Sequence, residues 1–390
     1  MTFVRIARLI SRELKFLLSD WRLLSILLFV PFAYSILFGY VYQPKRVSAI
    51  STWVIDEDHS ELSRTIRDGI SRSDTFAITR EDGSMAEFNL ATQQSEAFVC
   101  FVIPRDFEAD VKKGRTGRIT TFIDGSNMLI SNSAMRSAAE IGGTFSVAVQ
   151  MKRLAMRGTP SEYTQISSQP VETVTRVAYN PAFNYMDFLL PGLIATIIQQ
   201  VTLMGVALAF AKESELGLFG QVLSITKSPL EVLIAKGFTY TLINLLTSAL
   251  VFLIAIKGFG VSIAGSLPLF ALLLAIFIVA LVAMGLFISA IARDQLFATQ
   301  LLMLIAVPSF LISGFTWPQQ AMIPAIRVIS DALPLTHFVL AMRQIIVQGA
   351  DISIIRPHLL WLWCLTGISY LLAWFVIRGK MKRAAAFSAA

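Results

Sequence analysis

Charged residues are scarce in this sequence. Asp, Glu, Lys and Arg make up 15% of the 390 residues, whereas hydrophobic residues make up 55%, and the mean hydropathy is +0.65. A soluble globular domain usually carries about 25% charged residues. The shortage of charge excludes a soluble globular protein and predicts an integral membrane protein.

Cysteine and histidine are also rare. The two cysteines, Cys100 and Cys364, lie in a polar and an apolar region respectively, so we expect no intrachain disulfide. His59 stands among acidic residues, but one histidine in a solvated acidic loop lacks the ligand spacing of a metal site. We therefore expect no bound metal.

The common motifs of catalytic and nucleotide sites are missing too. The sequence contains no G-x-x-x-x-G-K-[ST], H-E-x-x-H or G-x-S-x-G pattern, and "KKGRTGRIT" at 112–120 resembles a phosphate loop only superficially. These absences disfavour a membrane enzyme. They predict a chain that binds no nucleotide or other cofactor directly.

Long apolar runs are what the sequence does contain. A membrane-spanning helix needs about 20 apolar residues, because the hydrocarbon layer is roughly 30 Å thick and offers no water to free backbone groups. Six such runs hold no acidic or basic residue, at 23–42, 188–211, 237–256, 267–291, 298–315 and 359–377. They predict a polytopic α-helical membrane protein with six transmembrane helices.

The distribution of charge predicts the orientation. Residues 44–180 hold 16 Lys and Arg against 17 Asp and Glu, whereas the rest holds 17 against 9. The basic excess therefore belongs to the membrane part, where Lys and Arg near span ends are retained in the cytoplasm. The basic residues at issue are Arg5, Arg8, Arg12, Lys15, Arg22, Lys212, Lys227, Lys236, Arg293, Arg378, Lys380, Lys382 and Arg383. Both termini are predicted to be cytoplasmic, and nucleic-acid binding is not needed to explain the basic character.

The first 20 residues place apolar side chains at helical spacing opposite Arg and Lys. These side chains are Phe3, Ile6, Leu9, Ile10, Leu14 and Leu17. The pattern predicts a cytoplasmic interfacial helix on anionic lipid, with an extension of the first span as the alternative. The apolar run that follows exceeds the roughly 7 to 15 residues of a signal peptide, so we expect an uncleaved anchor over 21–43.

The polar insert at 44–180 reads as an α/β domain on the extracytoplasmic side. "TWVIDED" and "TFAIT" are typical of strands, and Leu62, Ile66 and Ile70 between them have helical spacing. "EAFVCFVIP", "RDFEADVKKG" and "GRITTFIDGSN" repeat strand, helix and strand. A long helix is predicted to return from "SNSAMRS" toward the membrane.

A short amphipathic segment, "LFGQVLSIT", precedes the third apolar run. Glu213 and Glu215 come before it and favour the positive end of such a helix. Ser228, Pro229 and Glu231 form the pattern S-P-x-E, in which serine caps a helix, proline occupies its first turn and glutamate reaches back. The third span is therefore expected to begin there.

Prolines interrupt the chain after the fifth apolar run, in "SGFTWPQQAMIPAIRVISDALPLTHF" at 313–338. Pro318, Pro324 and Pro334 each remove a backbone donor, which predicts short re-entrant helices over 316–347. Arg327 and Asp331 are four residues apart and are expected to pair.

The same segment predicts an outward gate. Phe315, Trp317 and Phe338 are bulky enough to close an exit by dewetting, and an aromatic belt at the membrane interface is the alternative. His337 is expected to act as a hydrogen-bonding group rather than as a proton carrier. Arg343 is expected at a polar position near the interface.

Charge within the apolar runs is lacking, and this bears on the energy source. Ion-driven transporters usually keep a charged residue inside a span, whereas Asp187, Glu231, Lys236 and Asp331 lie only at the edges of these runs. The pattern predicts no ion coupling. An uncharged lining favours a hydrophobic or amphipathic cargo.

Several stretches together resemble the membrane subunits of type-2 ATP-binding-cassette (ABC) exporters. "KESELGLFGQVLSITKSPLEVLIAK" is similar to the family's cytoplasmic loop, and the 313–338 segment to its L-x-S-G-x-x-x-P-x-x-x-M-P region. "YNPAFNYMDFLLPGLIA" is similar to the family's entry into the second span, and "VIPRDF" with "FIDGSN" matches members that carry a large outer domain. The chain departs from the family at Leu218, where threonine is common, and at Ser228, which intervenes before Pro229.

The resemblance implies the permease subunit of an exporter that resides in a bacterial inner membrane. It implies a homodimer or heterodimer of permeases, two separate cytoplasmic ATPases that bind ATP and Mg²⁺, and in some members a periplasmic adaptor. The loop at 212–228 would dock on the ATPase. The coupling residues it implies are Glu213, Glu215, Gly217, Gln221, Leu223, Thr226 and Pro229. The gate segment comprises Phe315, Trp317, Pro318, Pro334, His337, Phe338 and Arg343.

The predicted domain order is an interfacial helix at 1–20, a first span at 21–43, the outer domain at 44–180, five spans over 181–377 and a cytoplasmic tail at 378–390. The alternative function is a membrane-anchored receptor or scaffold whose outer domain binds a ligand. That alternative predicts no association with an ATPase.

Overall fold

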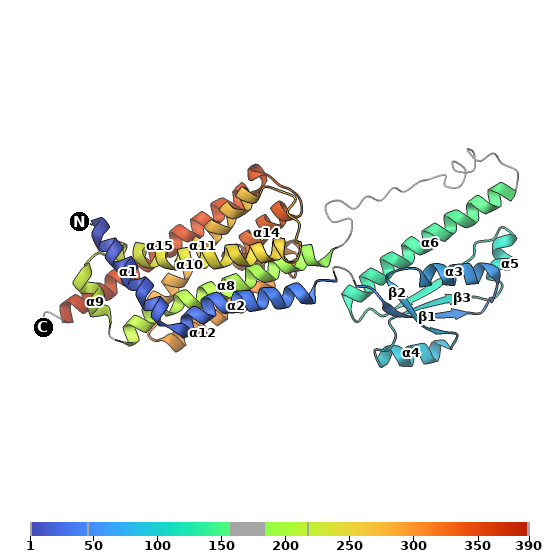
Figure 1. Cartoon of the computed structure of the whole chain (residues 1–390), viewed down its shortest axis with the longest axis horizontal. Coiled ribbons are helices and arrows are strands. Elements are labelled where there is room, and N and C mark those ends of the chain that lie inside the picture. The colour runs from blue at the N-terminus through green and yellow to red at the C-terminus, as the bar shows by residue number, and fades with distance from the viewer. Residues whose placement is uncertain (1, 45–46, 157–183, 217, 388–390) are drawn as a thin grey trace. The chain divides into compact units, whose positions relative to one another are not determined.

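Apolar helices build the larger of two units, which comprises Met1–Gln43 and Ala178–Ala390, whereas the other comprises Pro44–Val177. The computed structural model describes residues 2–44, 47–156, 184–216 and 218–387. The helices of the larger unit are α1 (Thr2–Ser19), α2 (Trp21–Val41), α8 (Tyr185–Glu215), α9 (Phe219–Ile225), α10 (Pro229–Lys257), α11 (Leu267–Ile291), α12 (Gln295–Ile312), η1 (Gln319–Ala321), α13 (Pro324–Asp331), α14 (Pro334–Ile346) and α15 (Ile352–Phe387) (Figure 1).

Six of the described helices are long and apolar enough to cross a membrane, namely α2, α8, α10, α11, α12 and α15. Each corresponds to one of the predicted apolar runs, although the first run, 23–42, extends one residue past α2 and the fifth, 298–315, extends past the end of α12. The short helices η1, α13 and α14 follow the prolines, since Pro318 precedes η1 and Pro324 and Pro334 begin α13 and α14. Helices α13 and α14 meet at 86°, which is the break that the prolines predict.

Helix α11 is the centre of the helical unit and packs against α8, α10, α14 and α15. Phe277 is buried there. Gly285 lets helices α8 and α11 approach closely. A Cβ at this position would lie only 2.9 Å from the Cβ of Val206. Near this contact Ser289 Oγ donates to the carbonyl of Ala207 at 2.5 Å. Small residues and hydroxyl bonds of this kind hold helices together where lipid removes the hydrophobic driving force.

Different elements lie at the two ends of the helical unit. Helix α9, the beginning of α1 and the last turns of α15 lie at one end, and α14 lies toward the other (Figure 1). Contacts of α9 with α1 and α15 agree with this arrangement. The connecting loop and the proline-broken segment therefore lie at opposite ends of the same set of helices.

The second unit contains a four-stranded sheet with strand order β2-β1-β3-β4. Strand β1 is parallel to β2 and β3, and β4 is antiparallel to β3. Its elements are β1 (Ile50–Asp56), α3 (Glu61–Ser71), β2 (Phe76–Glu81), α4 (Met85–Gln93), β3 (Val99–Ile103), α5 (Phe107–Lys112), β4 (Thr120–Ile123) and α6 (Met128–Met156). The strands and helices predicted from the insert occur in the predicted order.

Helices cover both faces of this sheet. Because successive side chains of a strand point to opposite faces, neighbouring residues pack against different helices. Val54 and Phe101 belong to the core shared with α3, α5 and α6, whereas Trp53 and Cys100 pack with Phe88 of α4. The sequence interpretation missed α4, although Ser84 and Glu87 form a capping box at its start. The signal S-x-x-E was present in the sequence.

Candidate functional site

The connection between α8 and α10 is short and tightly folded. Helix α8 ends at Glu215, α9 covers seven residues, and Thr226 is extended, with φ −150° and ψ 147°. The Thr226 hydroxyl accepts from the Ser228 backbone N–H at 3.0 Å and donates to the Glu231 carboxylate at 2.6 Å. Pro229 then begins α10. Thr226 thus fixes the turn that leads into the helix.

This geometry corrects two local predictions. Ser228 stands at the N-cap of α10, as expected, but its side chain makes no capping hydrogen bond, and Glu231 binds Thr226 instead. Glu213 and Glu215 do not lead the short helix, because both lie in the last turn of α8. Helix α8 extends further than the apolar run indicates, since its polar last turn is held by partners on other elements.

Some residues of the loop are buried against the helices, and others are exposed. Val222 of α9 and Thr226 are buried, whereas Gln221 and Ser224 are exposed. Glu215 is exposed and accepts hydrogen bonds from Gln295 at the start of α12, with its Oε2 2.8 Å from Gln295 Nε2. Of the remaining predicted coupling residues, Gly217 and the side chain of Leu223 lie outside the described residues.

Four charged side chains form a buried cluster directly behind this loop. Lys236 Nζ lies 2.8 Å from Glu13 Oε1 and 3.0 Å from Glu213 Oε2. Arg12 NH1 lies 2.8 Å from Glu213 Oε1 and 3.0 Å from Glu13 Oε1. The side chains of Lys236, Glu13 and Glu213 are at most 2% exposed. We call these residues the buried charge cluster, and its two carboxylates balance its two cations.

The cluster joins three helices that are distant in the sequence. Glu13 and Arg12 belong to α1, Glu213 to α8 and Lys236 to α10. Lys236 also donates to the carbonyl of Ala209 on α8 at 3.1 Å. Lys236 is therefore not an edge residue, as the apolar run suggested, because it lies two turns inside α10 and is buried.

Glu13 has the environment of a buried carboxyl. Burial raises the pKa of Glu13 above its ordinary value, although Lys236 acts in the opposite direction. Among the described residues, its Oε2 atom has no hydrogen-bond partner. Charges removed from water are costly unless they are paired, so the position of Glu13 depends on Lys236 and Arg12.

Two further ion pairs attach α1 to the arms of the loop. Asp20, which directly follows α1 and caps the start of α2, pairs with Lys212 of α8, and Arg5 of α1 lies 4.0 Å from Glu231 of α10. Burial acts to raise the pKa of Asp20, but the hydrogen bond from Lys212 and that from the Leu23 backbone outweigh it, so the pKa is lowered. Helix α1 is thus held to both sides of the α9 connection.

Sequence reasoning missed the buried charge cluster, although α1 carries a signal of it. Glu13 is the only acidic residue among 2–19, and it lies four residues from each of the buried Leu9 and Leu17. A lone carboxylate on the apolar stripe of a basic amphipathic helix indicates a buried cationic partner. The identity of that partner is not visible in the sequence.

Aromatic packing fixes the opposite end. Phe315 is buried, stacks on Phe188 with ring centroids 6.3 Å apart, and occupies the space beside Gly192, where a Cβ would lie 1.9 Å from Phe315 Cε2. The guanidinium of Arg343 lies 4.6 Å from the centre of the Phe188 ring and its NH2 lies 3.4 Å from the Phe315 carbonyl. The segment that follows α12 is thereby attached to α8 and α14.

The three predicted gate aromatics do not converge within this chain. Phe338 is fully buried and stacks on Phe277 of α11, with ring centroids 4.0 Å apart, whereas Trp317 is 58% exposed. Phe315 packs on α8 instead. Of the three, Trp317 alone presents its ring to the surroundings of the chain.

Both ring nitrogens of His337 take part in hydrogen bonds. Its Nε2 lies 2.8 Å from the Asp331 carbonyl, which accepts, so Nε2 carries the proton in the neutral ring. Its Nδ1 then accepts from His358 Nδ1 at 3.3 Å. The Asp331 carboxylate accepts from Gln319 Nε2 at 3.1 Å, and the described residues contain no Arg327–Asp331 ion pair, so that predicted pair is wrong.

The described structure therefore defines a polytopic membrane protein in which ion pairs brace one interhelical loop. The chain belongs to the ABC-2 family of transporter proteins, because residues 21–375 match the family described as ABC-2 family transporter protein. It is thus a permease, the membrane subunit of an ABC-2 type transporter, as the sequence resemblance predicted.

Curated relatives align along nearly the whole chain. The chain is 27% identical to the inner membrane transport permease YhhJ of Escherichia coli K12 over 366 residues, 93% of this chain and 94% of that protein. It is 26% identical to the probable multidrug ABC transporter permease YbhR of the same organism over 379 residues, 97% of this chain and 100% of that protein. The probable multidrug ABC transporter permease YbhS is 25% identical over 351 residues, 90% of each chain.

Removing the central cation of the buried charge cluster should destabilise the helical unit. We expect Lys236→Met to lower the free energy of unfolding by about 3–5 kcal/mol, since it leaves two buried carboxylates without their shared partner. Adding Glu13→Gln and Glu213→Gln should restore part of the loss. The measurement is SDS-induced unfolding in detergent micelles. Lys227→Met, at an exposed lysine, is the control, and equal stability of the two methionine variants would contradict the role of the cluster.

The Gly192–Phe315 contact gives a second stability prediction. Gly192→Ala should lower the free energy of unfolding by about 1–3 kcal/mol, because the added methyl group overlaps the Phe315 ring. Gly367→Ala on α15 is the matched control, since nothing lies within 4 Å of a Cβ there. Its stability should be unchanged or raised by up to about 1 kcal/mol. The same unfolding assay compares them, and a neutral Gly192→Ala would show that the ring is not held against α8.

Proposed function

We propose that this permease is the transmembrane subunit of an ATP-driven exporter of hydrophobic or amphipathic compounds. ABC-2 permeases work with ATPase partners in ABC transporters, and two relatives are named as probable multidrug permeases. The apolar spans support such a cargo. The charged groups of the buried charge cluster are neutralised by one another, which supports an energy source outside the chain.

Helix α9 is proposed as the element that docks on a cytoplasmic ATPase. The observation that carries this proposal is the bracing of α9 by the buried charge cluster, with Gln221 and Ser224 left exposed. A displacement of α9 is resisted at both of its ends, because Glu213 and Lys236 stand on the two helices that it connects. Force applied to the loop would therefore move α8 and α10 rather than deform the loop.

The orientation follows from the basic residues at the α9 end. Arg8 and Lys15 of α1 and Arg378 of α15 are exposed, both helices contact α9, and such residues are retained in the cytoplasm. We propose an inner-membrane protein, as YhhJ is named, with both termini cytoplasmic and the α/β unit on the periplasmic side. That unit would receive cargo or dock a periplasmic adaptor. The working assembly would contain two permeases, identical or related, and two ATPases.

Substitution on the exposed face of α9 tests the docking. Gln221→Arg should reduce the amount of ATPase that copurifies with the permease by about tenfold. The added charge and the larger side chain should weaken the binding free energy of the interface by roughly 1.4 kcal/mol. The measurement is affinity purification from native membranes, with the ATPase identified by its Walker motifs and by its MgATP hydrolysis. Gln348→Arg, an exposed glutamine after α14, is the matched control.

The result separates the two functions considered from the sequence. If Gln221→Arg retains the ATPase as well as Gln348→Arg does, α9 is not the docking element. If no ATPase copurifies with the unsubstituted permease, the receptor or scaffold function gains support. Unfolding of each variant is measured in parallel, so that a folding defect is recognised as such.

We also propose that the segment after α12 closes the outward end. Its support is the exposed ring of Trp317 next to the anchored Phe315. Phe338 is buried in the helical core, so its truncation would test the stability of the unit rather than the gate.

Trp317→Ala should increase passive ethidium leak from proteoliposomes at least about threefold, the effect of a barrier lowered by roughly 0.7 kcal/mol. Fluorescence of dye released from vesicles measures the leak. Trp363→Ala, an exposed tryptophan on α15, is the control, and equal leak in both would rule out the gate.

A further inference from the structure

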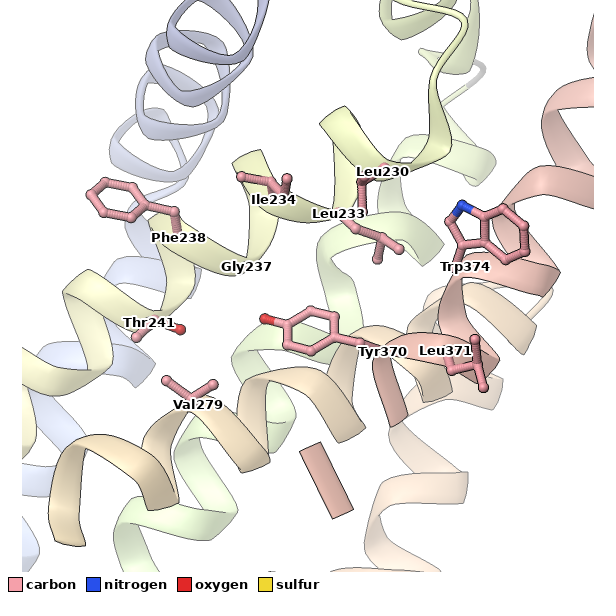
Figure 2. Close-up of a pocket in the computed structure, with 10 residues that line it drawn as sticks. All are labelled: Leu230, Leu233, Ile234, Gly237, Phe238, Thr241, Val279, Tyr370, Leu371 and Trp374. Carbon is pink, nitrogen blue, oxygen red and sulfur yellow. The ribbon is translucent and has the colours of Figure 1, made fainter. Parts of the chain in front are cut away.

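A groove of about 820 Å³ lies between α10, α11 and α15 (Figure 2). Its lining is Leu230, Leu233, Ile234, Gly237, Phe238, Thr241, Val279, Tyr370, Leu371 and Trp374. Gly237 creates part of its depth, since a Cβ there would lie 2.5 Å from Tyr370 Oη. Ligand sites typically enclose roughly 300–1,000 Å³ with mostly apolar walls and a few polar groups. The polar groups of the lining are the hydroxyls of Tyr370 and Thr241 and the indole N–H of Trp374.

The groove is open at the surface of the helical unit, beside the apolar helices α10 and α15. Leu230, Ile234 and Phe238 are exposed along one edge of α10, whereas Leu233 is buried. Because α10 and α15 are candidate spans, we expect these exposed side chains to face lipid. An occupant of the groove would therefore enter from the bilayer and be apolar along most of its length.

One end of the groove carries positive charge. The Arg378 guanidinium lies 5.0 Å from the centre of the Trp374 ring, and Lys227 precedes Leu230 by three residues. Both cations are exposed, and the described part of the chain offers neither of them an ion pair. The carboxylate of Glu231 does not neutralise this end, because it is buried against Thr226 and Arg5.

We propose that this groove binds one acyl chain of an anionic phospholipid, with the headgroup phosphate at Arg378 and Lys227. Apolar walls at membrane depth accept the chain, and clustered basic residues at a span end attract anionic headgroups. The tryptophan lies at the boundary, where its amphipathic ring is favoured. The assignment of this lipid to the cytoplasmic leaflet rests on the proposed orientation, whereas the site itself does not depend on ATPase docking.

The site lies directly beside the buried charge cluster. Gly237 of the groove follows Lys236 in α10, and Tyr370 and Leu371 come from α15. A bound chain fills the space between α10 and α15 on one face of α10, while Glu13 and Glu213 hold Lys236 on another. The lipid would thus brace the helix that leads out of the α9 connection.

Quenching of Trp374 by brominated lipid tests the proposal. The full-length permease is placed in vesicles of equimolar phosphatidylglycerol and phosphatidylcholine in which one lipid carries bromine on its acyl chains. Trp374 fluorescence is taken as the difference between the unsubstituted permease and Trp374→Phe. Quenching should indicate a relative association constant about thirtyfold higher for phosphatidylglycerol, because Arg378 and Lys227 each contribute roughly 1 kcal/mol.

Two variants separate the headgroup from the chain. Arg378→Gln with Lys227→Gln should abolish the preference while leaving quenching by both lipids. Thr241→Phe should fill the groove and weaken quenching by both, whereas Leu246→Phe, at an exposed position further along α10, should not.

Equal quenching by the two lipids would reduce the groove to ordinary lipid contact and overturn the proposal. Absence of Trp374 quenching would overturn it as well and would indicate that protein, such as a second copy, covers this face. The assay contains no ATPase or nucleotide, so failure of the proposed coupling role would leave its result unchanged.

Discussion

Buried charges must stay paired, and this constraint organises the end of the permease that carries α9. Lys236 shares its charge with Glu13 and Glu213 at distances of 3.0 Å or less. Separating α8 or α10 would leave Glu213 or Lys236 unpaired in an apolar environment, and separating α1 would remove Glu13 from Lys236 and Arg12 from Glu213. The position of α9 is therefore set by partners on three other helices, because a seven-residue helix is too short to be stable alone.

Helix α8 links this end to the other. Near its start, Phe188 and Gly192 hold the segment after α12 through ring stacking and close contact, and in its last turn Glu213 enters the buried charge cluster. One continuous helix thus connects the two candidate functional regions. The proposed transfer of work from a cytoplasmic ATPase to an outward gate needs a rigid element of this kind.

Local sequence features predicted much of the fold. The apolar runs correspond to the long helices, and the prolines at 318, 324 and 334 correspond to the breaks before η1, α13 and α14. The predicted strands and helices of the insert also occur in the structure, although α4 was missed. Errors arose where a side chain had alternative partners. Glu231 binds Thr226 rather than capping at Ser228, and Asp331 accepts from Gln319 rather than pairing with Arg327.

The sequence by itself determined the membrane class, the apolar spans and the order of strands and helices, since these depend on neighbours within one or two turns. Tertiary structure alone decided that Glu13 meets Lys236, 223 residues away, and that Gly237 admits Tyr370 to form a groove. Such contacts depend on which helices pack together. A single sequence records the residues that need a partner, but not the partner that folding brings to them.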